Sequence, residues 1–134
     1  MAQNLYSAEK QAKLQAAKTI LVIEDDLHVG YVLAQALKEE FSSKVIFATD
    51  ALQALKMIRL VLPDLILLDY HLPHMDGLAF IDLLRTFIEN QQIPIVLISG
   101  SLPEPIPSYT NVIALKKPFE LDILLEHATR LLEN

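Results

Sequence analysis

Short apolar runs alternate along this chain with longer stretches in which apolar residues recur at helical spacing. Five runs are almost continuously apolar, which is typical of strands that are covered on both faces in a parallel sheet. They are Thr19–Ile23, Lys44–Ala48, Leu65–Leu68, Ile93–Ile98 and Val112–Leu115. We expect each of these runs to form a buried strand.

The stretches that separate these runs carry the pattern of amphipathic helices. In each of them, apolar residues recur at i, i+3, i+4 and i+7, and together they form one stripe along the helix. The four stripes begin at Val29, Ala51, Phe80 and Leu121. The alternation of strands and helices predicts a doubly wound α/β domain, with right-handed crossovers and helices on both faces of a parallel sheet. We interpret the apolar residues of all these elements as core.

The connection between the fourth and fifth strands breaks this alternation. It runs from Gly100 to Asn111 and carries Pro103, Pro105 and Pro107 at every second position. A proline inside a helix costs about 3 kcal/mol and removes a backbone donor. We therefore predict an extended or turn-rich connection here, and a degenerate or missing helix.

Residues 1–18 differ in composition from the rest of the chain, because they are rich in Ala, Gln and Lys and contain few large apolar side chains. Three interpretations remain open: a terminal tail, a helix that docks on its own domain, or a linker from an upstream domain. We assign residues 1–18 to an N-terminal extension or interdomain linker. Residues 19–134 are long enough for one domain with its own core.

Composition and charge exclude several classes of function. The absence of cysteine excludes disulfides, thiolate metal sites and cysteine nucleophiles. A net charge of −6, with eleven scattered Lys and Arg residues, argues against direct binding of nucleic acid. No apolar run approaches the roughly 20 residues that cross a bilayer, so we expect no membrane contact. The lack of cysteine is also typical of the reducing cytoplasm, where we expect the domain to be located.

Polar side chains gather at the predicted strand ends. In an open parallel sheet all strands end at one edge, and ligands bind along that edge. The candidates are Glu24, Asp25 and Asp26 after the first strand, Asp69 after the third, Ser99 after the fourth, and Lys116 and Lys117 after the fifth. We expect these residues to meet in one site although they are far apart in the sequence.

The expected cluster of carboxylates needs a cation. Two carboxylates about 4 Å apart repel each other by roughly 4 kcal/mol at an effective dielectric near 20. Oxygen ligands without His or Cys favour a hard ion such as Mg²⁺. Lys117 adds a positive charge for phosphoryl oxygens. An aspartate nucleophile, Mg²⁺ and a lysine are together the components of phosphoryl transfer to an aspartate.

Four segments in order, ILVIEDD, PDLILLDYHLPHMDG, VLISG and LKKPFE, give the chain a specific resemblance to a known family. From Thr19 to Asn134 the sequence resembles the response regulator receiver domain of two-component signalling. The resemblance implies a flavodoxin-like sheet of five parallel strands in the order 2-1-3-4-5. It also implies roles for individual residues.

By this resemblance, Asp69 is the phosphoacceptor and Asp25 is the direct Mg²⁺ ligand. Glu24 corresponds to the acid that binds the ion through water, and the backbone carbonyl of His71 corresponds to the third protein ligand. Asp26 has no counterpart with a role in the family, and we interpret it as a helix cap.

Two further residues complete the implied site, and one position departs from the family. Ser99 corresponds to the switch hydroxyl and Lys117 to the invariant lysine, whose peptide bond to Pro118 is commonly cis in the family. The switch aromatic of the fifth strand is replaced by Ala114, which puts the usual coupling of hydroxyl and aromatic movement in doubt.

The proline-rich connection and His71 suggest two further hypotheses. Because the connection replaces a helix that many family members use for dimerisation, we expect this chain not to form the usual dimer through that face. The side chain of His71, together with Ser101, is a candidate for setting the lifetime of the phosphoryl group. An exposed loop histidine without a role is an equally good interpretation. We interpret His28, His74 and His127 as surface or boundary residues.

The resemblance predicts a phosphoacceptor domain that receives its phosphoryl group from a histidine kinase or a histidine phosphotransfer protein, with a possible downstream effector protein. We expect no enzymatic activity of this domain beyond catalysis of its own phosphorylation and dephosphorylation. We expect a stand-alone response regulator or the receiver of a hybrid sensor kinase. One alternative is a degenerate receiver that only binds proteins. Another is an aspartate-nucleophile phosphatase, which would need a second aspartate where His71 stands.

Overall fold

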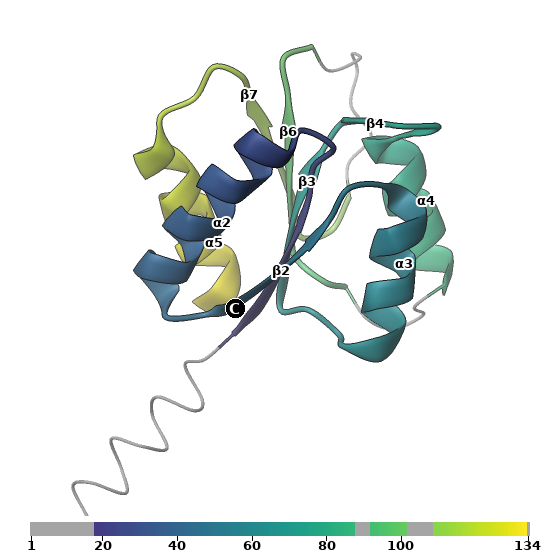
Figure 1. Ribbon diagram of the computed structural model, residues 1–134, viewed down its shortest axis with the longest axis horizontal. Helices are drawn as coiled ribbons and strands as arrows, with labels where there is room; N and C mark the ends of the chain where they lie inside the picture. The colour runs from purple at the N-terminus through teal and green to yellow at the C-terminus, as the bar shows by residue number, and fades with distance from the viewer. Residues whose placement is uncertain (1–17, 88–91, 102–108, 134) are drawn as a thin grey trace, which may run out of the picture.

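The computed structural model describes residues 18–87, 92–101 and 109–133 of the chain. A five-stranded parallel sheet runs through its centre, with helices on both sides (Figure 1). The strands are β1 (Thr19–Ile23), β2 (Lys44–Ala48), β3 (Leu65–Asp69), β6 (Ile95–Ser99) and β7 (Val112–Lys116). Their order in the sheet is β2-β1-β3-β6-β7. The predicted strand order 2-1-3-4-5 and the flavodoxin-like fold class are thus confirmed.

All four predicted helices are present. They are α2 (Leu27–Phe41), α3 (Ala51–Leu60), α4 (Gly77–Phe87) and α5 (Leu121–Glu133). Helices α2 and α5 cover one face of the sheet, and α3 and α4 cover the other (Figure 1). Each helix directs its apolar stripe toward the strands, and this produces one hydrophobic core on each face.

The central strands are apolar at nearly every position because both of their faces are buried. Successive residues of a strand point to opposite faces of the sheet. In β1, Leu21 and Ile23 therefore belong to the core under α3 and α4, whereas Ile20 and Val22 belong to the core under α2 and α5. Every residue of β3 and β6 is buried.

Three strands have bounds that differ from the prediction. Strand β3 includes Asp69, β7 extends to Lys116, and β6 begins at Ile95 rather than at Ile93. Pro94 explains the later start of β6, because proline has no N–H to donate to a neighbouring strand. Its carbonyl still accepts a hydrogen bond of 2.9 Å from the N–H of Ile66.

A short hairpin follows β3 and was not predicted. Its strands β4 (His71–Leu72) and β5 (Met75–Asp76) pair antiparallel, with His71 opposite Asp76. The hairpin turns at His74, which adopts a left-handed conformation with a φ of 66°. The N–H of Gly77 closes it by donating to the carbonyl of Tyr70 at 2.7 Å.

The proline-rich connection lies mostly outside the described residues, as does nearly all of the segment 1–18, so both predictions remain predictions. The described residues at the end of the connection contact α4. The hydroxyl of Tyr109 donates to Asp82 Oδ1 at 2.9 Å, and Arg85 donates to the carbonyls of Ile93 and Thr110. In the part of the chain that the structure describes, no helix is both long and apolar enough to span a membrane.

Candidate functional site

The polar residues at the strand ends lie together at the carboxyl edge of the sheet. Each of Glu24, Asp25 and Asp69 offers a carboxylate oxygen, and these oxygens all lie within 4.8 Å of one another. The amine of Lys117 approaches from beyond β7, and its Nζ is 3.8 Å from Asp69 Oδ1. Four side chains from three separate segments thus form one cluster.

Glu24 is positioned by β2 and by the residue that precedes α2. The N–H of Glu24 donates to the carbonyl of Ala48 on β2 at 3.0 Å, which fixes the strand end. The N–H of Asp26 donates to Glu24 Oε1 at 3.2 Å. Asp26 Oδ1 accepts from the N–H groups of His28 and Val29 and so caps α2, which confirms the interpretation of Asp26 as a helix cap.

Asp69 lies at the buried end of β3, where only 7% of the residue is exposed. Its Oδ1 accepts a hydrogen bond of 3.3 Å from the N–H of His71, and the same oxygen faces Lys117. The pairing with β6 continues one residue past Asp69, because the N–H of Tyr70 donates to the carbonyl of Ile98. The carboxylate itself is oriented by the backbone N–H of His71 and by the cation of Lys117.

Ser99 and Lys117 are linked by the backbone of the last two strands. The N–H of Lys117 donates to the carbonyl of Ser99 at 2.8 Å. The side chain of Ser99 is fully buried, and its Oγ accepts from the N–H of Ser101 at 3.0 Å. The Lys117–Pro118 peptide bond is cis, as the resemblance implied. Lys116 is exposed at the same edge of the sheet.

Gly77, the first residue of α4, packs closely against the segment that carries Asp69 and Tyr70. Sequence reasoning did not single it out. A Cβ atom on Gly77 would lie 2.7 Å from Leu97 Cδ1 and 3.0 Å from the Cα of Tyr70. Only glycine thus allows the hairpin with His71 to pack this closely on the strand end that carries Asp69. Gly77 lies three residues before the predicted helical stripe that begins at Phe80, and its position in the sequence carried no signal of this role.

The site carries more negative than positive charge. The pKa of Glu24 is raised to about 7, first by burial and then by the hydrogen bond and negative charge of Asp69, against the opposing effects of the Asp26 N–H and the charge of Lys117. Charges at 4.8 Å repel by roughly 3 kcal/mol at an effective dielectric near 20. Three carboxylates with oxygen ligands only, together with this repulsion, fit a hard divalent cation such as Mg²⁺.

The structure also describes the residues that concern the switch aromatic and the phosphoryl lifetime. Ala114 is exposed on β7 and pairs in register with Leu97. Tyr109, an aromatic residue close by in sequence, hydrogen-bonds to Asp82 on α4. The side chain of His71 is exposed, and its ring meets the ring of Tyr70 edge-on with centroids 4.9 Å apart.

Comparison with known proteins agrees with this geometry. The family model of the response regulator receiver domain matches residues 20–129. The transcriptional regulatory protein KdpE of Staphylococcus aureus is 38% identical over 109 residues, which cover 78% of this chain and 46% of that protein. A protein-glutamate methylesterase/protein-glutamine glutaminase of Rhodopseudomonas palustris is 38% identical over 86 residues, covering 63% of this chain and 23% of that protein. The chain thus spans less than half the length of either relative.

Solved structures show the same likeness. The signal receiver domain of a signal transduction histidine kinase from Syntrophus aciditrophicus superposes with a TM-score of 0.77 at 28% sequence identity. The match covers 87% of this chain and 91% of that domain. The family model, the strand order and the cluster at the sheet edge lead to one conclusion: this chain belongs to the response regulator receiver domain family of two-component systems.

Proposed function

We propose that this chain is a phosphoacceptor domain, which takes a phosphoryl group from a phosphohistidine onto Asp69 in a Mg²⁺-dependent reaction and changes conformation in response. The observation that carries the proposal is the position of Asp69, a buried carboxylate between Lys117 and two further acids. We assign this function to residues 19–134, with residues 1–18 as an extension or linker.

The proposed metal site consists of Asp69 and of residues that precede and follow it in the chain. Asp25, Asp69 and the backbone carbonyl of His71 would bind Mg²⁺ directly, and Glu24 would bind it through water. The bound ion would neutralise the carboxylates and the oxygens of the incoming phosphoryl group. The cluster of three carboxylates supports this assignment, because a cation removes their mutual repulsion.

The reaction itself requires a nucleophile and a charge balance. A carboxylate oxygen of Asp69 attacks the phosphorus of the phosphohistidine, and a new P–O bond forms as the P–N bond breaks. The bonding electron pair stays on the imidazole nitrogen, which takes up a proton from solvent. Lys117, 3.8 Å from Asp69 Oδ1, offers its positive charge to the phosphoryl oxygens.

Ser99 connects the phosphoryl group to the rest of the domain. Its buried Oγ accepts a hydrogen bond from the N–H of Ser101, which leaves the hydroxyl proton to be donated to a phosphoryl oxygen. A movement of Ser99 toward Asp69 would shift Ser101 with it. The exposed side chain of His71 and Ser101 are the residues we assign to control of the phosphoryl lifetime.

The donor is a histidine kinase or a histidine phosphotransfer protein, and the response passes to a downstream effector. We propose that the chain is either a stand-alone response regulator or the receiver of a hybrid sensor kinase. The likeness to the receiver domain of a histidine kinase from Syntrophus aciditrophicus supports the second possibility.

The test is the intact mass of the protein after incubation with phosphoramidate, with and without Mg²⁺. We expect a Mg²⁺-dependent gain of one phosphoryl group in the natural sequence and in Asp122→Asn, which alters an exposed aspartate on α5. The Asp69→Asn variant should gain nothing. If the natural sequence gained no phosphoryl group, or Asp69→Asn still gained one, the chain would be a receiver that only binds proteins.

A further inference from the structure

A groove with an apolar floor lies between the last turns of α2 and α5, at the edge where the strands of the sheet begin. It has a volume of about 330 Å³ and is lined by Lys18, Glu40, Phe41, Thr129, Leu132 and Glu133. The ends of both helices lie close to the beginning of β1 (Figure 1). Phe41 and Leu132 pack against the core under α2 and α5 but are only partly buried. The floor is thus a part of that core that the described residues leave partly exposed.

The chain enters the domain at the wall of this groove. The carbonyl of Lys18 accepts a hydrogen bond of 2.8 Å from the N–H of Lys44, which fixes the backbone beside β2. The side chain of Lys18 lines the groove, on the face of the sheet to which Ile20 also points. Residues 1–17, which lie outside the described residues, are therefore joined to the domain at the groove itself.

The rim of the groove carries mostly negative charge. Glu40 and Glu133 are exposed, and each lies in the last turn of a helix. The dipole of each helix adds a partial negative charge at this end. Among the lining residues, Lys18 is the single positive side chain. A positively charged segment with an apolar side chain would complement both the rim and the floor.

Residues 1–17 contain these groups. They carry two lysines, Lys10 and Lys13, against one acidic residue, although the whole chain has a net charge of −6. Leu14 directly follows Lys13 and lies four residues before Lys18. Four residues span at most about 14 Å. The leucine is therefore held near the groove by its own chain, at a high effective concentration.

We propose that residues 10–17 dock in this groove on their own domain, with the side chain of Leu14 between Phe41 and Leu132. The leucine covers the exposed part of the floor, which is favourable because apolar surface is removed from water. The two lysines of the segment lie near the carboxylates of the rim. Of the three interpretations of the N-terminal segment, this selects the one in which it docks on its own domain.

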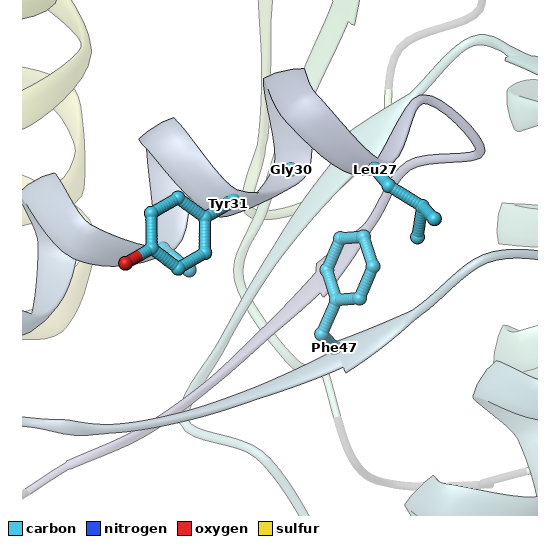
Figure 2. A pocket seen from close by; sticks show the side chains of 5 residues that line it. Leu27, Gly30, Tyr31 and Phe47 are labelled. Atoms are coloured by element: carbon cyan, nitrogen blue, oxygen red, sulfur yellow. The ribbon is translucent and has the colours of Figure 1, made fainter.

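A second groove does not offer the same complement. It lies between α2 and β2 and is lined by Leu27, Gly30, Tyr31, Ala34 and Phe47 (Figure 2). None of these lining residues is charged, and they lie toward the other end of α2 from Phe41. The N-terminal segment therefore has neither an electrostatic attraction to this groove nor a short connection to it. Tyr31, which is 64% exposed, is thus a suitable control position.

Disulfide trapping in the complete chain tests the docking. The sequence contains no cysteine, so an introduced pair has no competing thiol in its own chain. Gln15→Cys combined with Thr129→Cys places one thiol next to Leu14 and the other in the groove, where Thr129 is exposed. On mild oxidation of a dilute solution, we expect a disulfide within one chain. Intact mass and the mass of the linked peptides identify it.

Two control pairs separate docking from the proximity of tethered residues. Gln15→Cys with Leu60→Cys places the second thiol at the end of α3, at the same edge of the sheet but on its opposite face. Gln15→Cys with Tyr31→Cys places it in the second groove. Both should form the disulfide about tenfold more slowly than the Thr129 pair. Leu14→Ser should slow the Thr129 pair by about tenfold, because the buried leucine is lost.

The charges are tested in the Thr129 pair. Glu40→Lys should slow the disulfide by about two- to fivefold at low salt, as for one exposed ion pair. Asp122→Lys, at the other end of α5, should leave the rate unchanged. Asp69→Asn should also leave it unchanged, since the groove lies at the opposite edge of the sheet. This result is therefore separate from the test of phosphorylation.

Circular dichroism of each variant establishes that it is folded. A Thr129 pair that reacts no faster than the two control pairs would overturn the proposal. So would a rate that Leu14→Ser leaves unchanged. A disulfide that joins two chains would also overturn it, because the groove would then hold the segment of a second copy.

Discussion

Lys117 Nζ lies 3.8 Å from Asp69 Oδ1, although Asp69 ends β3 and Lys117 follows β7, two strands that are separated by β6. The backbone holds both ends of this pair, because Tyr70 donates to Ile98 and Lys117 donates to Ser99. The amine is 37% exposed and the carboxylate 8%. The positive charge of Lys117 has two expected effects. It stabilises negative oxygens near Asp69, and it competes with a bound cation for the Asp69 carboxylate.

Replacement of Lys117 by methionine should change these two properties in opposite directions. The rate of phosphorylation by phosphoramidate should fall by roughly 100-fold, as for the loss of one group that stabilises a developing charge. The affinity for Mg²⁺ should rise, because a competing positive charge is removed. Mass spectrometry over time measures the first, and isothermal titration calorimetry the second. Lys116→Met is the control, and a loss of Mg²⁺ affinity in Lys117→Met would contradict this account.

The raised pKa of Glu24 predicts that the metal-free protein loses stability as the pH rises. The pKa is about 7 in the folded protein against 4.5 as the ordinary value, so the folded state holds the proton more tightly. This contribution is fully present below about pH 4.5 and is lost as the pH passes 7. It amounts to about 3 kcal/mol.

Urea unfolding at pH 5 and pH 8 measures this loss. In Glu24→Gln the side chain cannot ionise, so this part of the pH dependence should disappear. Addition of Mg²⁺ at pH 8 should stabilise the natural sequence, since the ion binds the ionised carboxylates of the folded state. An equal pH dependence in the natural sequence and in Glu24→Gln would show that another group is responsible.

The arrangement of the sheet and the membership of the site were predictable because each rests on a local pattern. A strand buried on both faces must be apolar throughout, as β3 and β6 are, and parallel strands must end at one edge. Glu24, Asp69 and Lys117 could therefore be placed together from their positions after strands. Strand bounds were less accurate where a single residue decides them, as at Pro94.

Other features depend on contacts between segments and left little trace in the sequence. The hairpin of β4 and β5 has two residues in each strand, which is too short for an alternating pattern. Gly30 looks like an unfavourable residue inside a helix until the ring of Phe47 is seen against it. The pKa of Glu24 likewise depends on burial and on Asp69, which no spacing reveals.

The neighbouring residues Asp25 and Asp26 should separate metal binding from folding. Asp26→Ala removes the cap of α2 and should lower the free energy of unfolding by about 1 kcal/mol, with Mg²⁺ binding retained. Asp25→Ala removes a carboxylate from the cluster and should abolish Mg²⁺-dependent phosphorylation with little loss of stability. Calorimetry with Mg²⁺ and urea unfolding distinguish the two. Loss of Mg²⁺ binding in Asp26→Ala, with Mg²⁺ binding retained in Asp25→Ala, would refute the proposed metal site.

Gly77→Ala should destabilise the protein although alanine is the better helix former. The added Cβ would lie 2.7 Å from Leu97 Cδ1 and 3.0 Å from the Cα of Tyr70, and such overpacking typically costs about 1–3 kcal/mol. Because Tyr70 follows Asp69, the displacement should also slow phosphorylation. Gly100→Ala is the matched control, since nothing lies within 4 Å of a Cβ at that position.

The Leu97→Ala variant identifies the source of this strain. On its own, Leu97→Ala leaves a cavity in the core. Combined with Gly77→Ala, it removes the contact between the added Cβ at position 77 and Leu97 Cδ1. The cost of Gly77→Ala measured by urea unfolding should therefore be smaller in the Leu97→Ala background than in the natural sequence. The contact with the backbone of Tyr70 remains in the double variant, so the rate of phosphorylation should recover only in part. Additive costs of the two changes would mean that Leu97 does not limit the residue at position 77.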